Sequence, residues 1–222
     1  MSGSGKTTLA FHVIENFIKN DKPFLVFDWK KSFRPLMERD HEIACFTVGN
    51  DGVSNNFRTN INRPPAGIPP KEWINTLCDL LTESFSASYG VHKVLIETLN
   101  ESFKEWGIYE GTENYPTWHQ IKWKLEQKFQ KSRGRESGWV ESALRIATVL
   151  TFGSYGKVVN YKGNNSIAVE DLLNKKIIFE MNSLGNLEKK FFCEFVLTYI
   201  YKLKKAESVA SEKFNYAILV DE

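Results

Sequence analysis

The chain has 222 residues, enough for one sizeable α/β domain, and its 42% hydrophobic and 25% charged residues exclude a disordered chain. A net charge of +2 excludes a uniformly basic nucleic-acid binder, so any nucleic-acid-binding surface must be a local patch. The first residues have no secretory pattern and no apolar run approaches the roughly 20 residues of a membrane span, so we expect a cytoplasmic protein.

The first part of the chain alternates between helix and strand signals. Residues 2–8 (SGSGKTT) have the composition of a loop, and the apolar residues that follow at a spacing of four predict a helix that ends near Asn20. Continuous apolar runs at 24–28 (FLVFD) and 43–48 (IACFTV) are typical of strands buried on both faces.

The middle of the chain predicts helices only. Segment 63–70 (RPPAGIPP) has four prolines in eight residues, so we expect an extended connector there, and it is the clearest internal boundary. From 71 to 153, apolar stripes at helical spacing follow one another without a convincing strand pattern. We interpret 71–153 as a helical insertion within a single α/β domain that spans 1–222.

The alternation of helix and strand signals resumes after the insertion. In order, we expect a short helical turn (169–173), a strand (176–181, KIIFEM), a long amphipathic helix (187–206) and a final buried strand (216–220, YAILV). Strands that alternate with helices predict a mostly parallel sheet.

The cysteines and histidines indicate neither a disulfide framework nor a zinc site. Cys45, Cys78 and Cys193 are odd in number, lack CxxC spacing and have apolar neighbours, so we expect buried free thiols. The four histidines are scattered without ligand spacing, and surface or core positions are the better interpretation.

The start of the chain matches the end of a phosphate-binding loop, whose pattern is G-x-x-x-x-G-K-[ST]. Gly5-Lys6-Thr7 closes the pattern, and the first glycine would stand one position before Met1. Glycines let successive backbone N–H groups face an anion, and the helix that follows directs its N-terminus at the phosphates. A Gly/Ser-rich start that merely resembles the motif is the alternative. The nucleotide-binding candidates are Ser2, Gly3, Ser4, Gly5, Lys6, Thr7 and Thr8.

Three of these candidates have specific expected roles. Lys6 would reach the β- and γ-phosphates, the Thr7 hydroxyl would bind Mg²⁺, and Thr8 would lie near the α-phosphate. We therefore expect ATP and Mg²⁺ as cofactors, with Lys6 counted among the catalytic residues. The chain lacks the guanine-selecting string NKxD, which favours ATP over GTP.

The end of the chain supplies the expected partner of a phosphate loop. In YAILVDE, Asp221 would bind Mg²⁺ and Glu222 would orient or deprotonate the attacking water. A glutamate beside the Mg²⁺-binding aspartate is more typical of motor-type ATPases than of kinases or small GTPases. A strand end with two solvated acids is the alternative interpretation.

Two further features have two interpretations each. Asp28, at the end of its strand, either contacts the nucleotide site or caps the next turn, and the cap is the better interpretation on chemistry alone. Between Trp118 and Arg135, lysines and arginines outnumber acids and alternate with aromatic residues. That stretch is either a DNA-backbone contact or, as we favour, an amphipathic helix with a solvated basic face and core aromatics.

The order SGSGKTT, FLVFDWKKSF, helical insert, KKIIFEMNSLGNLEKKFF and YAILVDE resembles the HerA/FtsK superfamily of DNA-pumping ATPases, and the HerA branch most. Members often have a D-x-K-G-like string after the second strand. Here Asp28 and Lys30 match, but Lys31 stands where glycine is usual. The resemblance spans nearly the whole chain, and its two nucleotide motifs are specific to P-loop ATPases in general.

The resemblance implies a RecA-like core, a hexameric ring and ATP-driven movement of double-stranded DNA, with a nuclease or a membrane complex as further partners. It also implies a trans-acting arginine and a polar sensor that cannot be placed in this sequence. Because the strand before the phosphate loop would precede Met1, we expect a fragment that runs from Walker A to Walker B. The alternatives are a conjugation, secretion or genome-packaging ATPase and a non-hydrolysing nucleotide-gated assembly module.

Overall fold

The sheet contains, within the described residues, four strands in the order β2-β3-β1-β4: β1 (Phe24–Asp28), β2 (Ala44–Thr47), β3 (Lys176–Glu180) and β4 (Ala217–Asp221). All three strand pairs are parallel, and every residue of β1 and β3 is buried. The structure is a computed structural model that describes residues 5–50, 52, 55–163, 169–207 and 216–221. The parallel sheet and its four strand positions are confirmed.

The described residues form two units. The first contains the sheet and comprises the described parts of 1–57, 168–185 and 209–222. The second comprises the described parts of 58–167 and 186–208 and is helical.

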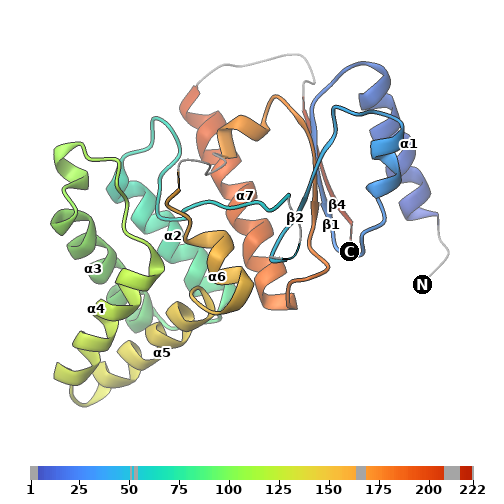
Figure 1. Cartoon of the computed structure of the whole chain (residues 1–222). Helices are drawn as coiled ribbons and strands as arrows, with labels where there is room; N and C mark the ends of the chain where they lie inside the picture. Colours follow the sequence, from blue (N-terminus) through green and yellow to red (C-terminus); the bar gives the residue numbers. More distant parts are fainter. Residues whose placement is uncertain (1–4, 51, 53–54, 164–168, 208–215, 222) are drawn as a thin grey trace. The chain divides into compact units, whose positions relative to one another are not determined.

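In the sheet unit, α1 (Lys6–Lys19) and the 3-10 helix η1 (Arg34–Glu38) pack on one face of the sheet (Figure 1). Their buried residues join those of three strands in one apolar cluster: Ile14, Phe24, Val26, Phe33, Leu36, Ile43, Cys45 and Ile178. The predicted helix is confirmed and ends before Asn20. Of its apolar positions, Leu9 and Val13 point away from the core, with 66% and 40% of their surface exposed.

The direction of α1 follows from its connection to β1. The helix ends at Lys19 and β1 begins at Phe24, so the end of α1 and the start of β1 share the amino edge of the sheet. Asp21, in the connection, pairs there with Lys176 at the start of β3 (Oδ1–Nζ, 2.7 Å). A 14-residue helix is about 21 Å long and a five-residue strand about 17 Å, so α1 begins at the carboxyl edge.

β4 differs from the fully buried strand that its apolar sequence predicts. Its residues alternate between partly buried and exposed: Ala217 and Leu219 pack against the α1 cluster, whereas Ile218 and Val220 are 39% and 46% exposed. Among the described residues, β4 has a strand neighbour on one side only, and its face opposite α1 is partly exposed. A continuous apolar run therefore does not establish burial on both faces.

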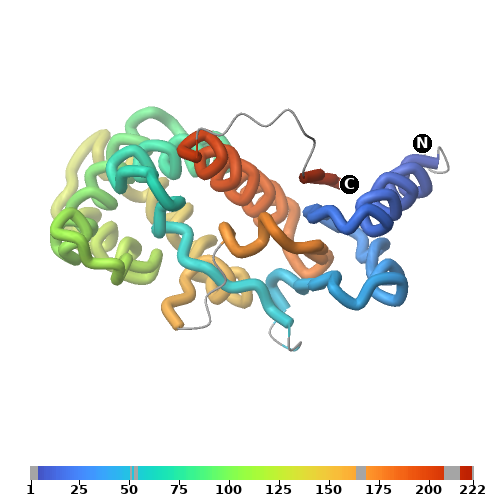
Figure 2. Tube along the Cα trace, turned by 90° about the horizontal axis from the view of Figure 1, so that it is seen from above, coloured from blue at the N-terminus to red at the C-terminus, as the bar shows by residue number. Residues whose placement is uncertain are grey.

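The helical unit confirms the predicted run of helices after the proline-rich connector. Its helices are α2 (Pro70–Ser84), α3 (Tyr89–Glu105), the 3-10 helix η2 (Ile108–Glu110), α4 (Trp118–Lys131), α5 (Arg135–Val149), α6 (Gly153–Val159) and α7 (Asn186–Glu207). The long helix α7, orange to red in Figure 2, packs on α2, where the Trp73 ring lies 6.1 Å from Phe195 and 5.4 Å from Tyr199.

The three cysteines are free and buried, as predicted. In the sheet unit, the short helical turn η3 (Val169–Leu172) precedes β3 at the predicted place. Across the described parts of the chain, none of the helices combines the length and apolarity needed to cross a membrane.

Candidate nucleotide-binding site

Three acidic residues lie side by side where the parallel strands end. The strand register places Asp28 between Glu180 of β3 and Asp221 of β4. Alternate residues of a strand share a face, so Asp28 belongs with Phe24 and Val26 to the face that α1 covers. Glu180, Asp28 and Asp221, here called the acidic row, therefore line the carboxyl edge on the α1 side.

The first turn of α1 lies at this same edge and is open to solvent. Gly5 caps the helix with φ 72° and ψ 9°, a left-handed conformation that favours glycine, and its carbonyl accepts the first helical hydrogen bond from Leu9 N (2.9 Å). Gly5, Lys6 and Thr7 are exposed. The first N–H groups of a helix have no partner within the helix and carry a partial positive charge, so this turn suits an anion.

Asp28 caps the turn that follows β1, as the better of its two interpretations predicted. One carboxylate oxygen accepts a hydrogen bond from Lys30 N (3.1 Å) and the other accepts one from Phe33 N (2.8 Å). The side chain is buried, so these bonds satisfy a charge that would otherwise be costly to remove from water. The role of Asp28 that these contacts establish is local: it holds the turn in shape.

Lys31, which replaces the usual glycine of the D-x-K-G-like string, has φ 67°. A side chain in this left-handed region costs about 1–2 kcal/mol, and glycine avoids that cost but loses about 0.5–1 kcal/mol through its greater freedom when unfolded. We therefore expect Lys31→Gly to raise the free energy of unfolding by about 0.5–1 kcal/mol in urea titrations. Lys30→Gly, outside the left-handed region, is the control and should give no gain; equal effects of the two substitutions would contradict the prediction.

Glu180 is the site residue that the sequence analysis did not identify. Its side chain is fully buried and forms a two-point ion pair with Arg34: Arg34 Nε lies 2.8 Å from Oε1 and Nη2 lies 2.7 Å from Oε2. The Thr47 hydroxyl donates a third hydrogen bond, 3.1 Å long. The sequence pattern that could have identified Glu180 is KIIFE, an apolar run that ends in an acid, as FLVFD and AILVD do.

The pKa of Glu180 reflects two opposing influences. Burial alone would raise it, because burial disfavours the charged form. The hydrogen bonds from Arg34 and Thr47, together with the positive charges of Arg34 and Lys31, outweigh burial and hold the pKa below its usual range. Glu180 is therefore a carboxylate at neutral pH, and its charge is matched by Arg34.

The predicted site residues that the structure describes gather at one end of the sheet. Gly5, Lys6, Thr7 and Thr8 form the start of α1, and Asp221 ends β4 at the same carboxyl edge. Ser2, Gly3, Ser4 and Glu222 lie outside the described residues. Within the part of the chain that is described, no three His, Cys, Asp or Glu side chains cluster closely enough to hold a metal ion.

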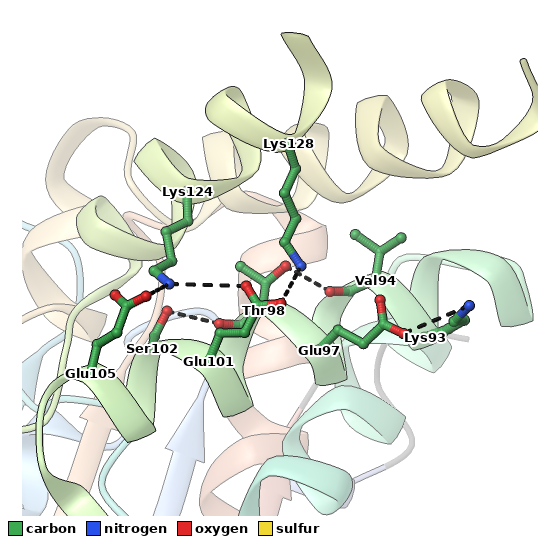
Figure 3. A network of polar contacts seen from close by, with 9 residues as sticks. All are labelled: Lys93, Val94, Glu97, Thr98, Glu101, Ser102, Glu105, Lys124 and Lys128. Atoms are coloured by element: carbon green, nitrogen blue, oxygen red, sulfur yellow. Dashed lines mark hydrogen bonds and ion pairs between the residues drawn. The ribbon is translucent and has the colours of Figure 1, made fainter. Parts of the chain in front are cut away.

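The basic stretch in the helical unit is partly neutralised by the neighbouring helix. On α4, Lys124 Nζ lies 2.5 Å from Glu105 of α3, and Lys128 Nζ lies 3.1 Å from Glu101 (Figure 3). Trp118 is buried as the favoured interpretation requires, whereas Trp123 and Phe129 are 60% and 39% exposed and are not core aromatics. The lysines that face α3 therefore have carboxylate partners within the chain.

Comparison with known proteins identifies a structural neighbour. The solved structure of VirB4 of Thermoanaerobacter pseudethanolicus is similar to this chain with a TM-score of 0.69 and 14% sequence identity, over 98% of this chain and 80% of that one. The sequence matches no protein-family model and none of the curated proteins. The likeness confirms an α/β fold with a RecA-like, parallel sheet.

Proposed function

We propose that the chain is the ATP-binding and ATP-hydrolysing core of a P-loop motor. The observation that supports this most is that the first turn of α1 and Asp221 both lie at the carboxyl edge of a parallel sheet. In open α/β sheets, ligands bind outside the carboxyl ends of the strands, and phosphates bind at the helix N-terminus that opens there. The sequence motif and the edge of the sheet thus independently favour one nucleotide site.

In this proposal, each site residue has a distinct role. Backbone N–H groups of the loop that ends at Gly5 hold the phosphates, and the Lys6 ammonium neutralises charge on the β- and γ-phosphates. Thr7 and Asp221 would hold Mg²⁺, which would supply positive charge beside the phosphates, and Glu222 would orient or deprotonate the attacking water. A hydroxyl and one carboxylate are oxygen ligands that suit this ion beside a triphosphate.

The resemblance to the HerA/FtsK superfamily extends the proposal to a hexameric cytoplasmic ring that moves double-stranded DNA, with a nuclease or a membrane complex as a further partner. The structural likeness to VirB4 favours the conjugation and secretion ATPases among the alternatives. If hydrolysis rises when double-stranded DNA is added, DNA is the polymer moved; if hydrolysis is unaffected by DNA, a protein-secretion role gains support.

The test of the proposed function is phosphate release from ATP by the purified protein. We expect turnover that requires Mg²⁺, stops with EDTA and is faster with ATP than with GTP. Lys6→Ala removes a charge-assisted contact worth about 1.5–3 kcal/mol, so it should weaken nucleotide binding by about tenfold or more, measured with a fluorescent ATP analogue. Lys19→Ala, in the last turn of the same helix, is the control. Wild-type protein that neither binds nor hydrolyses ATP would contradict the proposal.

A further inference from the structure

Residues 28–34, here called the β1 turn, contact both α1 and β4, the two elements that carry the proposed nucleotide site. Near its start, Trp29 N donates a hydrogen bond to the carbonyl oxygen of Asp221 in β4 (3.3 Å). Later in the turn, the Phe33 ring stacks on Phe11 of α1, with ring centroids 4.9 Å apart and planes 12° from parallel. The turn therefore touches both the helix that begins with Lys6 and the strand that ends with Asp221.

The β1 turn is fixed at both ends. Asp28 accepts the two backbone hydrogen bonds from Lys30 and Phe33, and its carbonyl accepts one from Met181 N (2.9 Å). At the other end, the Arg34 guanidinium is held by both oxygens of Glu180.

The Glu180 side chain is fully buried, so its carboxylate has no access to water as an alternative partner, and the two-point geometry fixes the direction of Arg34. Half of the Arg34 side chain remains exposed, so Arg34 reaches the buried Glu180 carboxylate from the surface of the carboxyl edge. The pair thus ties the β1 turn to the end of β3.

We infer that Arg34 is a positioning residue of the nucleotide site: through Glu180 it fixes the β1 turn, and the turn sets the first turn of α1 against Asp221. This inference rests on the proposed function. In this inference Arg34 acts through the Phe33–Phe11 and Trp29–Asp221 contacts and not through a contact with ATP. A displacement of about 1 Å between reacting groups can slow an enzyme 100-fold, so the position of α1 relative to Asp221 affects turnover more than nucleotide binding.

The experiment replaces Arg34 by lysine, which keeps the positive charge but loses the planar two-point contact. We expect kcat for ATP to fall about tenfold and the nucleotide Kd to change less than about threefold, at a temperature where circular dichroism shows a folded protein. Phe11→Leu changes the α1 side of the Phe33–Phe11 contact. It keeps an apolar contact but loses the stacked ring, so it should also lower kcat.

The matched control is Thr47→Val. Thr47 donates to the same Glu180 carboxylate, but from β2 and not from the β1 turn, so the loss of its hydroxyl should lower the melting temperature and leave kcat unchanged. Equal kcat losses in Arg34→Lys and Thr47→Val, or an unchanged kcat in Arg34→Lys, would overturn the inference and leave the proposed function standing. Wild-type protein that neither binds ATP nor turns it over would contradict both the inference and the proposed function.

Discussion

Glutamine in place of Glu222 is expected to slow ATP hydrolysis by about 10²–10⁴-fold, the range that a positioned general base contributes. The amide keeps the size of the side chain and can still contact water, but it cannot accept the proton. Binding of ATP to the α1 end of the site should be retained, because Gly5, Lys6 and Thr7 are unchanged. The variant should therefore bind ATP with near wild-type affinity and fail to release phosphate.

The measurement compares single-turnover phosphate release with the Kd of a fluorescent ATP analogue in wild type and variant. Glu126→Gln, an exposed glutamate of α4 in the helical unit, is the control for a general effect of lost charge. If Glu222→Gln hydrolyses ATP at the wild-type rate, Glu222 is not the base. If the wild type also binds ATP without hydrolysing it, the non-hydrolysing assembly module becomes the better interpretation.

The strands and helices were predictable because their signals are local. FLVFD and KIIFE are apolar runs that any buried parallel strand would show, and the helical stripes between 71 and 153 need no knowledge of their partners. Gly5-Lys6-Thr7 likewise carries its chemistry in adjacent residues. These features could be identified from a few neighbouring positions each.

The remaining features depend on contacts between distant parts of the chain. Arg34 and Glu180 are 146 positions apart, and only the register of β1 with β3 brings them together at one edge. The exposure of Ile218 and Val220 depends on what covers β4, which an apolar run does not specify. The left-handed conformation of Lys31 was hidden because glycine, the usual signal for it, is absent.

Replacing Arg34 by methionine is expected to lower the free energy of unfolding by about 3 kcal/mol, the lower end of the range for breaking a buried ion pair, since half of Arg34 is solvated. The loss arises because Glu180 stays fully buried and loses both hydrogen bonds from the Arg34 guanidinium, while the hydrogen bond from Thr47 remains. Urea titration at pH 7 measures it. The control Arg39→Met breaks the ion pair with Glu15, which is less buried than Glu180. We expect it to lower the free energy of unfolding by less than about 1 kcal/mol.

The pH dependence separates a lost ion pair from lost packing. In the wild type the pKa of Glu180 is depressed, so its contribution is complete above the unfolded pKa of about 4.3 and is lost as the pH falls through the folded pKa. Without Arg34, burial dominates and raises the pKa, so the variant loses stability as the pH rises. The difference between wild type and Arg34→Met should therefore be larger at pH 7 than at pH 4. A difference independent of pH would indicate packing alone.

A double variant tests whether the buried charge causes the loss of stability. If the cost of Arg34→Met comes from stranding the Glu180 carboxylate, then Arg34→Met with Glu180→Met should be more stable than Arg34→Met alone, because paired replacement of a buried ion pair by apolar groups is often close to neutral. The same double variant should lose the pH dependence of the single one. Stability that falls further in the double variant would show that the Glu180 carboxylate, even unpaired, contributes more through Thr47 than its burial costs.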